Sequence, residues 1–112
     1  MPDSPTIAKH GLNVLIATVS NILQAESSDA IDLADYADRS IQLSGTFGAA
    51  SIGVTGSNDG VTYSPLHDPA GDVIAITVAG ISAILEYTPF VKIVATGGGG
   101  TTDLTAVISA RK

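Results

Sequence analysis

Polar and apolar residues alternate with a period of two in the middle of this chain. Over residues 40–47, the side chains of Ile41, Leu43 and Phe47 share one set of alternate positions with a glycine, and polar residues hold the other set. Residues 51–57 alternate in a similar way. Because successive side chains of a β-strand point to opposite faces, these runs predict two strands with one buried face each.

Turn signals divide the chain that follows. Asn58-Asp59-Gly60 comes directly after the second alternating run, and Asn or Asp before Gly at a strand end is typical of a hairpin. Residues 79–86 are long enough for one helical turn or a bent connection. Further strands are predicted over 61–66, 72–78, 89–95 and 101–110, with a turn at 67–71 and a glycine loop at 97–100.

The first third of the chain is more ambiguous. Residues 12–19 are rich in β-branched side chains and are predicted as a strand, although a short helix fits the same nearly continuous apolar run. Within residues 22–38, an aspartate recurs at every third position: Asp29, Asp32, Asp35 and Asp38. Asp is a poor interior residue of both helices and strands. We prefer a strand centred on residues 30–33, followed by a turn through residues 35–38.

These elements predict an all-β protein, namely a single antiparallel β-sandwich of seven or eight short strands. With 112 residues the chain has the length of one domain. Residues 1–10 are predicted as an extended N-terminal arm, and residues 11–112 as the sandwich domain. The arm is either a disordered tail or a segment that orders on a neighbouring subunit. In the second case, its partner-binding residues are predicted to be Pro2, Pro5, Ile7 and His10.

Composition adds a reason to expect association. Apolar residues make up 45% of the chain, whereas charged residues make up only 14%, against about 25% in a typical domain. A surface with few charges has little to keep neighbouring molecules apart. Two explanations fit this composition equally well. One is burial of the surface against partner subunits, and the other is a neutral drift toward alanine and glycine. The chain has no cysteine, so no disulfide reinforces a thin core.

Charge and the amino-terminal sequence limit the partners and the compartment. The net charge is −6 and only five residues are Lys or Arg, so binding to nucleic acid is not expected. The first residues lack the basic and apolar regions of a secretory signal, and no apolar run approaches the roughly 18 residues of a membrane span. We therefore expect a protein that is made in the cytoplasm and does not enter a membrane.

No pattern of catalytic or metal-binding residues stands out. His10 and His67 are far apart in sequence, and the four aspartates lack the glycine turn and closing glutamate of a calcium loop. The glycines at 97–100 are not followed by the lysine of a phosphate loop, and no Gly-x-Ser-x-Gly elbow occurs. We expect no enzyme, metal or cofactor. A glycosidase-like pair of Glu26 and Glu86 is the open alternative.

Several motifs over residues 41–112 nevertheless resemble a known family. In order, they are Leu-Ser-Gly-Thr-Phe-Gly (43–48), Val-Thr-Gly-Ser-Asn-Asp-Gly-Val-Thr-Tyr (54–63), Leu-His-Asp-Pro-Ala-Gly (66–71), Gly-Ile-x-x-Ile-Leu-Glu (80–86), Pro-Phe-Val-Lys (89–92) and Gly-Gly-Gly-Gly-Thr-Thr-Asp-Leu-Thr (97–105). This series is similar to the head decoration, or cement, proteins of tailed bacteriophages. In many relatives the aromatic residue after the Gly-Ser-Asn-Asp-Gly hairpin is Trp, whereas here it is Tyr63, which disfavours carbohydrate binding.

The resemblance implies a jelly-roll-like sandwich that works as a virion structural protein on the capsid exterior. Such a subunit, made in the host cytoplasm, would bind and bridge major capsid proteins and stabilise the shell, as a homodimer or homotrimer. The family has no catalytic residues to carry over. The Gly-Ser-Asn-Asp-Gly hairpin also occurs in phage tail domains. The alternative is therefore a tail, neck or fibre module that binds a partner protein or a host glycan.

Overall fold

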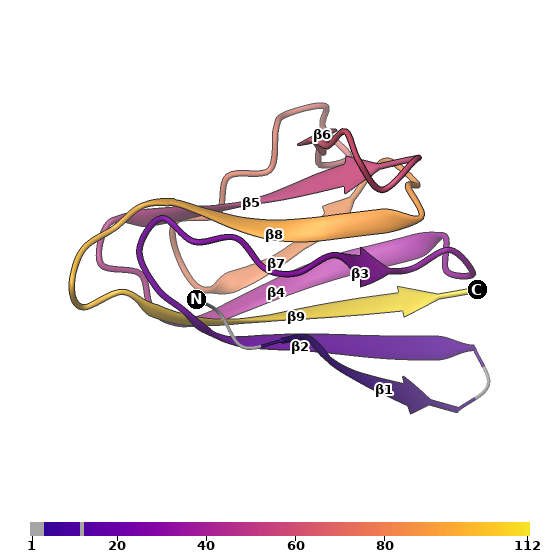
Figure 1. Ribbon diagram of the computed structural model, residues 1–112, viewed down its shortest axis with the longest axis horizontal. Helices are drawn as coiled ribbons and strands as arrows, with labels where there is room; N and C mark the ends of the chain where they lie inside the picture. Colours follow the sequence, from indigo (N-terminus) through magenta and orange to yellow (C-terminus); the bar gives the residue numbers. More distant parts are fainter. Residues whose placement is uncertain (1–3, 12) are drawn as a thin grey trace.

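The computed structural model describes residues 4–11 and 13–112, and over these residues it consists of nine β-strands in two antiparallel sheets (Figure 1). The larger sheet has the strand order β1-β2-β9-β4-β7, and the smaller has the order β3-β8-β5-β6. The strands are β1 (Thr6–His10), β2 (Val14–Ile22), β3 (Ile31–Asp32), β4 (Asp38–Thr46), β5 (Ala50–Ser57), β6 (Ser64–Pro65), β7 (Gly80–Ile84), β8 (Phe90–Gly97) and β9 (Asp103–Arg111). The predicted all-β antiparallel sandwich is confirmed.

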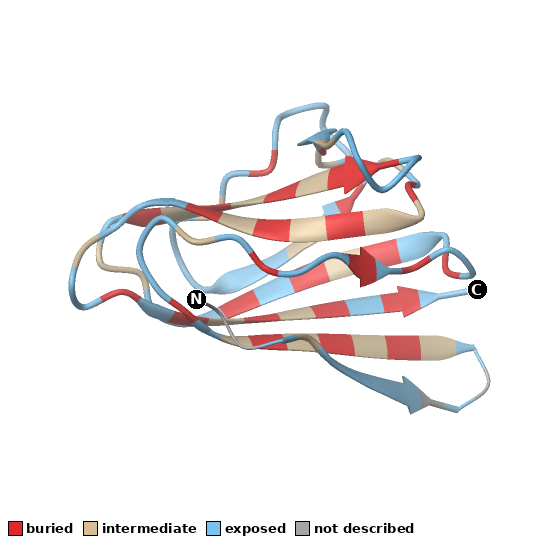
Figure 2. Ribbon diagram, viewed as in Figure 1, coloured by how far each residue is buried: buried red, intermediate tan, exposed pale blue. Residues whose placement is uncertain are grey.

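The core lies between the two sheets and follows the alternation of the sequence. Figure 2 shows buried positions alternating with less buried ones along β2, β4, β5, β8 and β9. In the central strand β9, every second side chain is buried, namely Leu104, Ala106, Ile108 and Ala110, as predicted. Each fully buried Leu or Ile contributes about 1.5–3 kcal/mol of hydrophobic stabilisation.

The ambiguous first third is resolved in favour of strands. The strand alternative for residues 12–19 is correct from Val14 onward, where β2 pairs with β9 through most of its length. Leu12 lies outside the described residues. Ile31 and Leu33 are buried and Asp32 between them is exposed, as expected for a strand centred here. The following turn is shorter than predicted, because the amide of Tyr36 donates to the Leu33 carbonyl and β4 already begins at Asp38.

The segment between β5 and β8 differs most from the sequence prediction. The strand expected over residues 61–66 shrinks to β6, and the strand expected over 72–78 is reduced to isolated bridges at Val73 and Ile76. Residues 79–86 contain no helical turn; instead they contain β7, which pairs with β4 from Arg39 to Leu43. A pattern this short does not identify its partner, and hydrogen bonds to β4 decide its conformation.

Half of the predicted arm forms a strand of the larger sheet within the same chain. Thr6–His10 pairs with β2 as an antiparallel hairpin, with Gly11 in the turn at a φ of 77°. Figure 1 shows this strand, β1, at the outer edge of the larger sheet. Pro2 lies outside the described residues, and the division of the chain at residue 10 stays a prediction.

Candidate interaction surface

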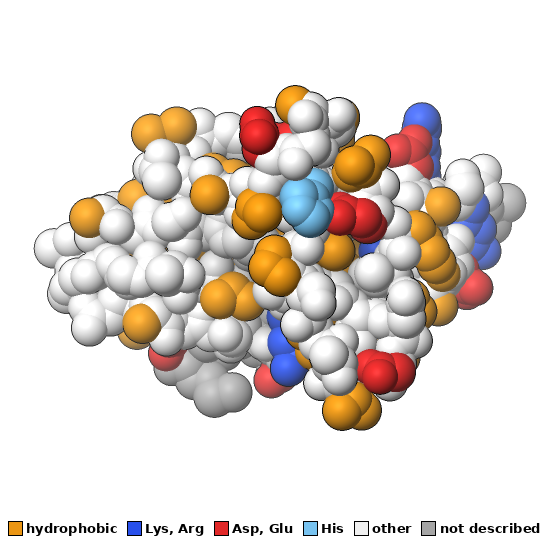
Figure 3. Space-filling view, turned by 90° about the horizontal axis from the view of Figure 1, so that it is seen from above, with side chains coloured by type: hydrophobic (Ala, Val, Ile, Leu, Met, Phe, Trp, Pro, Cys, Tyr) orange, Lys and Arg blue, Asp and Glu red, His pale blue; other side chains and the backbone are white. Residues whose placement is uncertain are grey.

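Exposed apolar side chains are concentrated in one part of the described chain. Eight large hydrophobic residues are exposed, and only Ile7 and Leu23 lie outside residues 61–87. The other six are Val61, Val73, Val78, Ile81, Leu85 and Tyr87. Figure 3 shows one face of the molecule, on which orange hydrophobic side chains lie among white atoms of the backbone and of other side chains. Contiguous exposed apolar area on a folded domain commonly marks a place where another molecule binds.

His67 joins two of these apolar residues. It forms an antiparallel bridge with Val73 on one side, and on the other its carbonyl accepts a hydrogen bond of 2.8 Å from the amide of Leu85. Val73 and Leu85 therefore lie on either side of His67. We use the name β7 apolar surface for Val73, Val78, Ile81 and Leu85. Ile81 lies in β7, Val78 lies two residues before this strand, and the bridge at His67 holds Val73 beside Leu85.

Glu86 fixes His67 in this position. One carboxylate oxygen, Oε1, accepts a hydrogen bond of 2.7 Å from the His67 amide, and the other contacts Nδ1 of the imidazole closely. Burial opposes the charged carboxylate, but the hydrogen bonds from His67 outweigh it and hold the pKa of Glu86 below its usual value. The two residues are 19 positions apart in sequence. No local pattern therefore indicated the pair, and both carboxylate oxygens are already engaged by His67.

An apolar groove lies beside this surface on the outer face of the smaller sheet. It has a volume of about 330 Å³ and is lined mainly by small or apolar residues, including Gly53, Pro65, Val73, Ala75 and Val94. A Cβ atom at Gly53 would lie 3.2 Å from the Ile74 carbonyl oxygen, so this glycine lets the 73–75 segment approach β5 closely. The groove extends the apolar area beyond β7.

The predicted Asn58-Asp59-Gly60 turn is held by the Asp59 carboxylate and by the Ser57 hydroxyl, which accepts hydrogen bonds from the amides of Asp59 and Gly60. Oδ1 of Asp59 accepts hydrogen bonds from the amides of Val61 and Thr62 and from the hydroxyl of Ser57. These bonds stabilise the charged form and lower the pKa of Asp59 to about 2. The carboxylate thus has a structural role in the loop. Beyond the loop, Nζ of Lys92 lies 4.5 Å from the centre of the Tyr63 ring and covers one of its faces.

The Asp59 loop gives a testable pH dependence. A carboxyl group whose pKa falls on folding stabilises the native state above its unfolded pKa, here near 3.8, and loses that contribution as the pH falls toward about 2. We expect the wild-type protein to have a higher melting temperature than Asp59→Asn at about pH 6, and this advantage to shrink between about pH 4 and pH 2. Calorimetry of both proteins measures it. An equal difference at both ends of that range would contradict the assignment.

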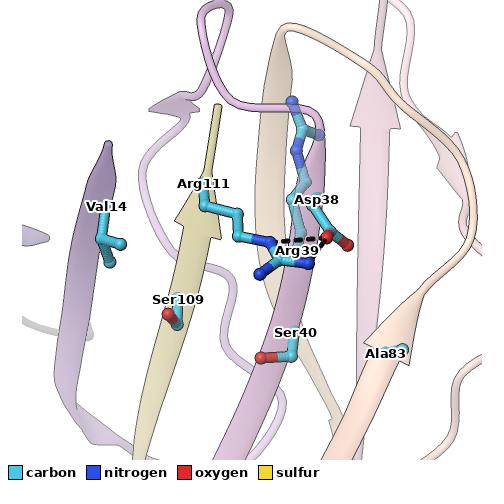
Figure 4. Close-up of a pocket in the computed structure, with 7 residues that line it drawn as sticks. All are labelled: Val14, Asp38, Arg39, Ser40, Ala83, Ser109 and Arg111. Carbon is cyan, nitrogen blue, oxygen red and sulfur yellow. Dashed lines mark hydrogen bonds and ion pairs between the residues drawn. The ribbon is translucent and has the colours of Figure 1, made fainter. Parts of the chain in front are cut away.

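An ion pair between Arg111 and Asp38 lies on the outer face of the larger sheet, where most described side chains are uncharged. Figure 4 shows Arg111 of β9 reaching across to Asp38 of β4, above a shallow hollow lined by Val14, Ser40, Ala83 and Ser109. The Arg111 Nε and Asp38 Oδ2 atoms are 2.7 Å apart, and both side chains are more than half exposed. An exposed pair of this kind contributes little stability, about 0–1 kcal/mol.

The arm residues that were predicted to bind a partner lie apart from the β7 apolar surface, since β1 and β7 are at opposite edges of the larger sheet. Pro5 is half-buried beside β1, Ile7 is 48% exposed within it, and His10 ends this strand. Of the four aspartates, Asp32 accepts the Ala34 amide and Asp38 pairs with Arg111. Among residues 4–11 and 13–112, no three His, Cys, Asp or Glu side chains gather as a metal site would require.

Sequence and structure comparisons assign no relative to this chain. Its sequence matches no protein-family model and no curated protein, and its fold matches no solved structure. The described part of the chain has no helix of the length and hydropathy needed to cross a membrane. Functional inference therefore rests on the chain's own residues.

Proposed function

We propose that this protein is a virion structural subunit that decorates the exterior of a bacteriophage capsid and bridges its major capsid proteins. The observation that carries the proposal is the β7 apolar surface on a chain with only 14% charged residues. Leaving four large aliphatic side chains in water is unfavourable, at about 25 cal/mol per Å² of apolar area. Covering them against a capsid protein recovers this free energy.

The sequence motifs supply the choice of a capsid as the partner. Their similarity to decoration proteins lies within residues 41–112. One of the motifs, Gly80–Glu86, contains β7 and also Glu86, whose carboxylate binds the amide and the imidazole of His67. The acidic net charge suits a position on the outside of a shell, away from packaged DNA. Stacking of a sugar on Tyr63 is disfavoured, because Lys92 already covers one face of the ring.

Copy number in the particle tests the proposal directly. Virions that carry this gene are purified, and the band of this protein on a denaturing gel is compared with the band of the major capsid protein. A ratio near one to one supports decoration of the shell. A faint band would instead favour a tail, neck or fibre module, and absence from the particle would overturn both assignments.

A binding assay tests the surface itself. Shells that lack this protein are mixed with purified wild-type chain, Leu85→Lys or Leu23→Lys, and the bound fraction is measured after sedimentation. Leu85 is 57% exposed on the β7 apolar surface, whereas Leu23 is 42% exposed outside it, so both lysines are compatible with the fold. We expect Leu85→Lys to weaken binding by at least about tenfold, as burial of an unpaired charge would, and Leu23→Lys to bind normally. Equal binding by all three proteins would contradict the assigned surface.

A further inference from the structure

The strand β7 forms an open edge of the larger sheet. In the described part of the chain it pairs only with β4, from Arg39–Ile84 to Leu43–Gly80. The unpaired part of this edge ends at Leu85, because the Leu85 amide points away from β4 and donates a hydrogen bond to the His67 carbonyl. Since backbone groups alternate sides along a strand, those of Ile81 and Ala83 also point away from β4. No other strand of the described chain pairs with them. The Ala83 carbonyl accepts a hydrogen bond of 3.2 Å from the neighbouring Ser82 hydroxyl, so the edge is short and open to a further strand.

This edge lacks the features that normally prevent edge strands from pairing. Proteins protect such edges with charged residues, especially lysine, with proline, or with very short strands. At the other edge of the same sheet, β1 contains Lys9 and follows Pro5, and the edge strands of the smaller sheet, β3 and β6, have two residues each. By contrast β7 has five residues, none of them charged or proline, and its Ile81 is 68% exposed.

The sequence of β7 is complementary to itself in one antiparallel register. If two copies pair about a two-fold axis at Ser82, Ile81 of each copy lies opposite Ala83 of the other, and Ile84 lies opposite Gly80. Each large side chain then faces a small one on the same face of the joined sheet. This register also pairs the outward backbone groups of Ile81 and Ala83 with each other, which yields four hydrogen bonds between the chains. The Ala83 carbonyl can accept one of them beside the Ser82 hydroxyl, because a carbonyl oxygen has two lone pairs.

We infer that β7 is the contact between two copies of this chain, which join their larger sheets into one continuous antiparallel sheet. A two-fold axis gives an antiparallel pair, whereas joining β7 of one copy to β1 of the next would give a parallel pair, because these strands run in the same direction within the sheet. The inference goes beyond the proposed function, because it concerns two copies in solution and does not depend on a capsid.

The first test measures self-association of the full chain. Sedimentation velocity over a concentration series is expected to show a dimer that dissociates in the micromolar range or weaker, because the paired segment is short. Ile81→Lys should weaken dimerisation by at least about tenfold, because each lysine takes the place of a packed isoleucine near its symmetry mate. The matched control is Ile7→Lys at the β1 edge, which should dimerise like the wild type.

The second test fixes the register. Directly opposed residues that are not hydrogen-bonded to each other have Cα atoms about 4.5 Å apart, which fits a disulfide, whereas diagonal neighbours are about 7–8 Å apart. Because the chain has no cysteine, Ser82→Cys and Ala83→Cys each introduce a single thiol. Under mild oxidation Ser82→Cys should give a covalent dimer at least about tenfold faster than Ala83→Cys.

Defined results would overturn this inference. They are a wild-type chain that stays monomeric up to millimolar concentration, a dimer that is lost in Ile7→Lys but kept in Ile81→Lys, and equal cross-linking of the two cysteine variants. Circular dichroism of every variant confirms that a lost dimer is not a lost fold. Failure of shell binding with an intact dimer would overturn the proposed function alone, since the two experiments use different partners.

Discussion

Replacing Gly45 with alanine should lower the free energy of unfolding by about 2–6 kcal/mol, because two penalties add. Gly45 has a φ of 110°, a backbone conformation that residues with a Cβ atom rarely adopt. A Cβ atom there would also lie 2.4 Å from the carbonyl oxygen of Asp103 in the neighbouring strand β9. Backbone strain and overpacking each cost about 1–3 kcal/mol, and neither β4 nor β9 can move without disturbing the core.

Thermal unfolding measures this effect. For a domain of this size, about 4 °C of melting temperature corresponds to 1 kcal/mol, so Gly45→Ala should melt at least about 8 °C below the wild type. Gly100→Ala is the matched control, since it adds the same methyl group where no atom lies within 4 Å. The explanation would be wrong if both variants melted at the same temperature.

Arg39→Met should lower the free energy of unfolding by about 2–4 kcal/mol, since two buried carbonyl groups lose a charged donor. Arg39 is only 3% exposed, and its Nε and Nη2 atoms donate to the carbonyls of Tyr36 and Leu33 at 2.8 and 2.9 Å. The guanidinium carbon lies 4.7 Å from the centre of the Tyr87 ring. Burial lowers the pKa of Arg39, yet the guanidinium stays protonated at neutral pH.

The loss is limited because the arginine is itself costly to bury. Its Nη1 atom is buried without a hydrogen-bond partner among the described residues, and methionine removes that penalty together with the charge. Arg39→Lys should fall between methionine and the wild type, because one ammonium group does not reproduce the planar fork that reaches both carbonyls. Chemical denaturation of the three proteins measures the order. A methionine variant as stable as the wild type would show that these carbonyls find other donors.

Both residues show how far sequence reasoning reached. The alternation around Ile41 and Leu43 predicted β4 and its buried face, and it placed Gly45 in phase with these residues, although Gly45 itself is exposed. It did not indicate that the backbone of β9 passes so close to this glycine. The alternation over residues 40–47 assigns no role to Arg39, which directly precedes it. Its position on the buried side follows from parity with Ile41, yet its acceptors belong to the turn before β4, whose path only the folded chain defines.

The candidate interaction surface shows the same division between what the sequence determined and what the tertiary structure decided. The sequence by itself determined an antiparallel sandwich with most of its strands and turns and a surface poor in charge, because these depend on period-two patterning and local turn chemistry. Only the tertiary structure decided that residues 80–84 form an edge strand, that Glu86 clamps His67, and that the exposed aliphatic side chains gather there. Pairing between distant strands is a long-range choice, and short apolar runs fit several partners equally well until the rest of the sheet is formed.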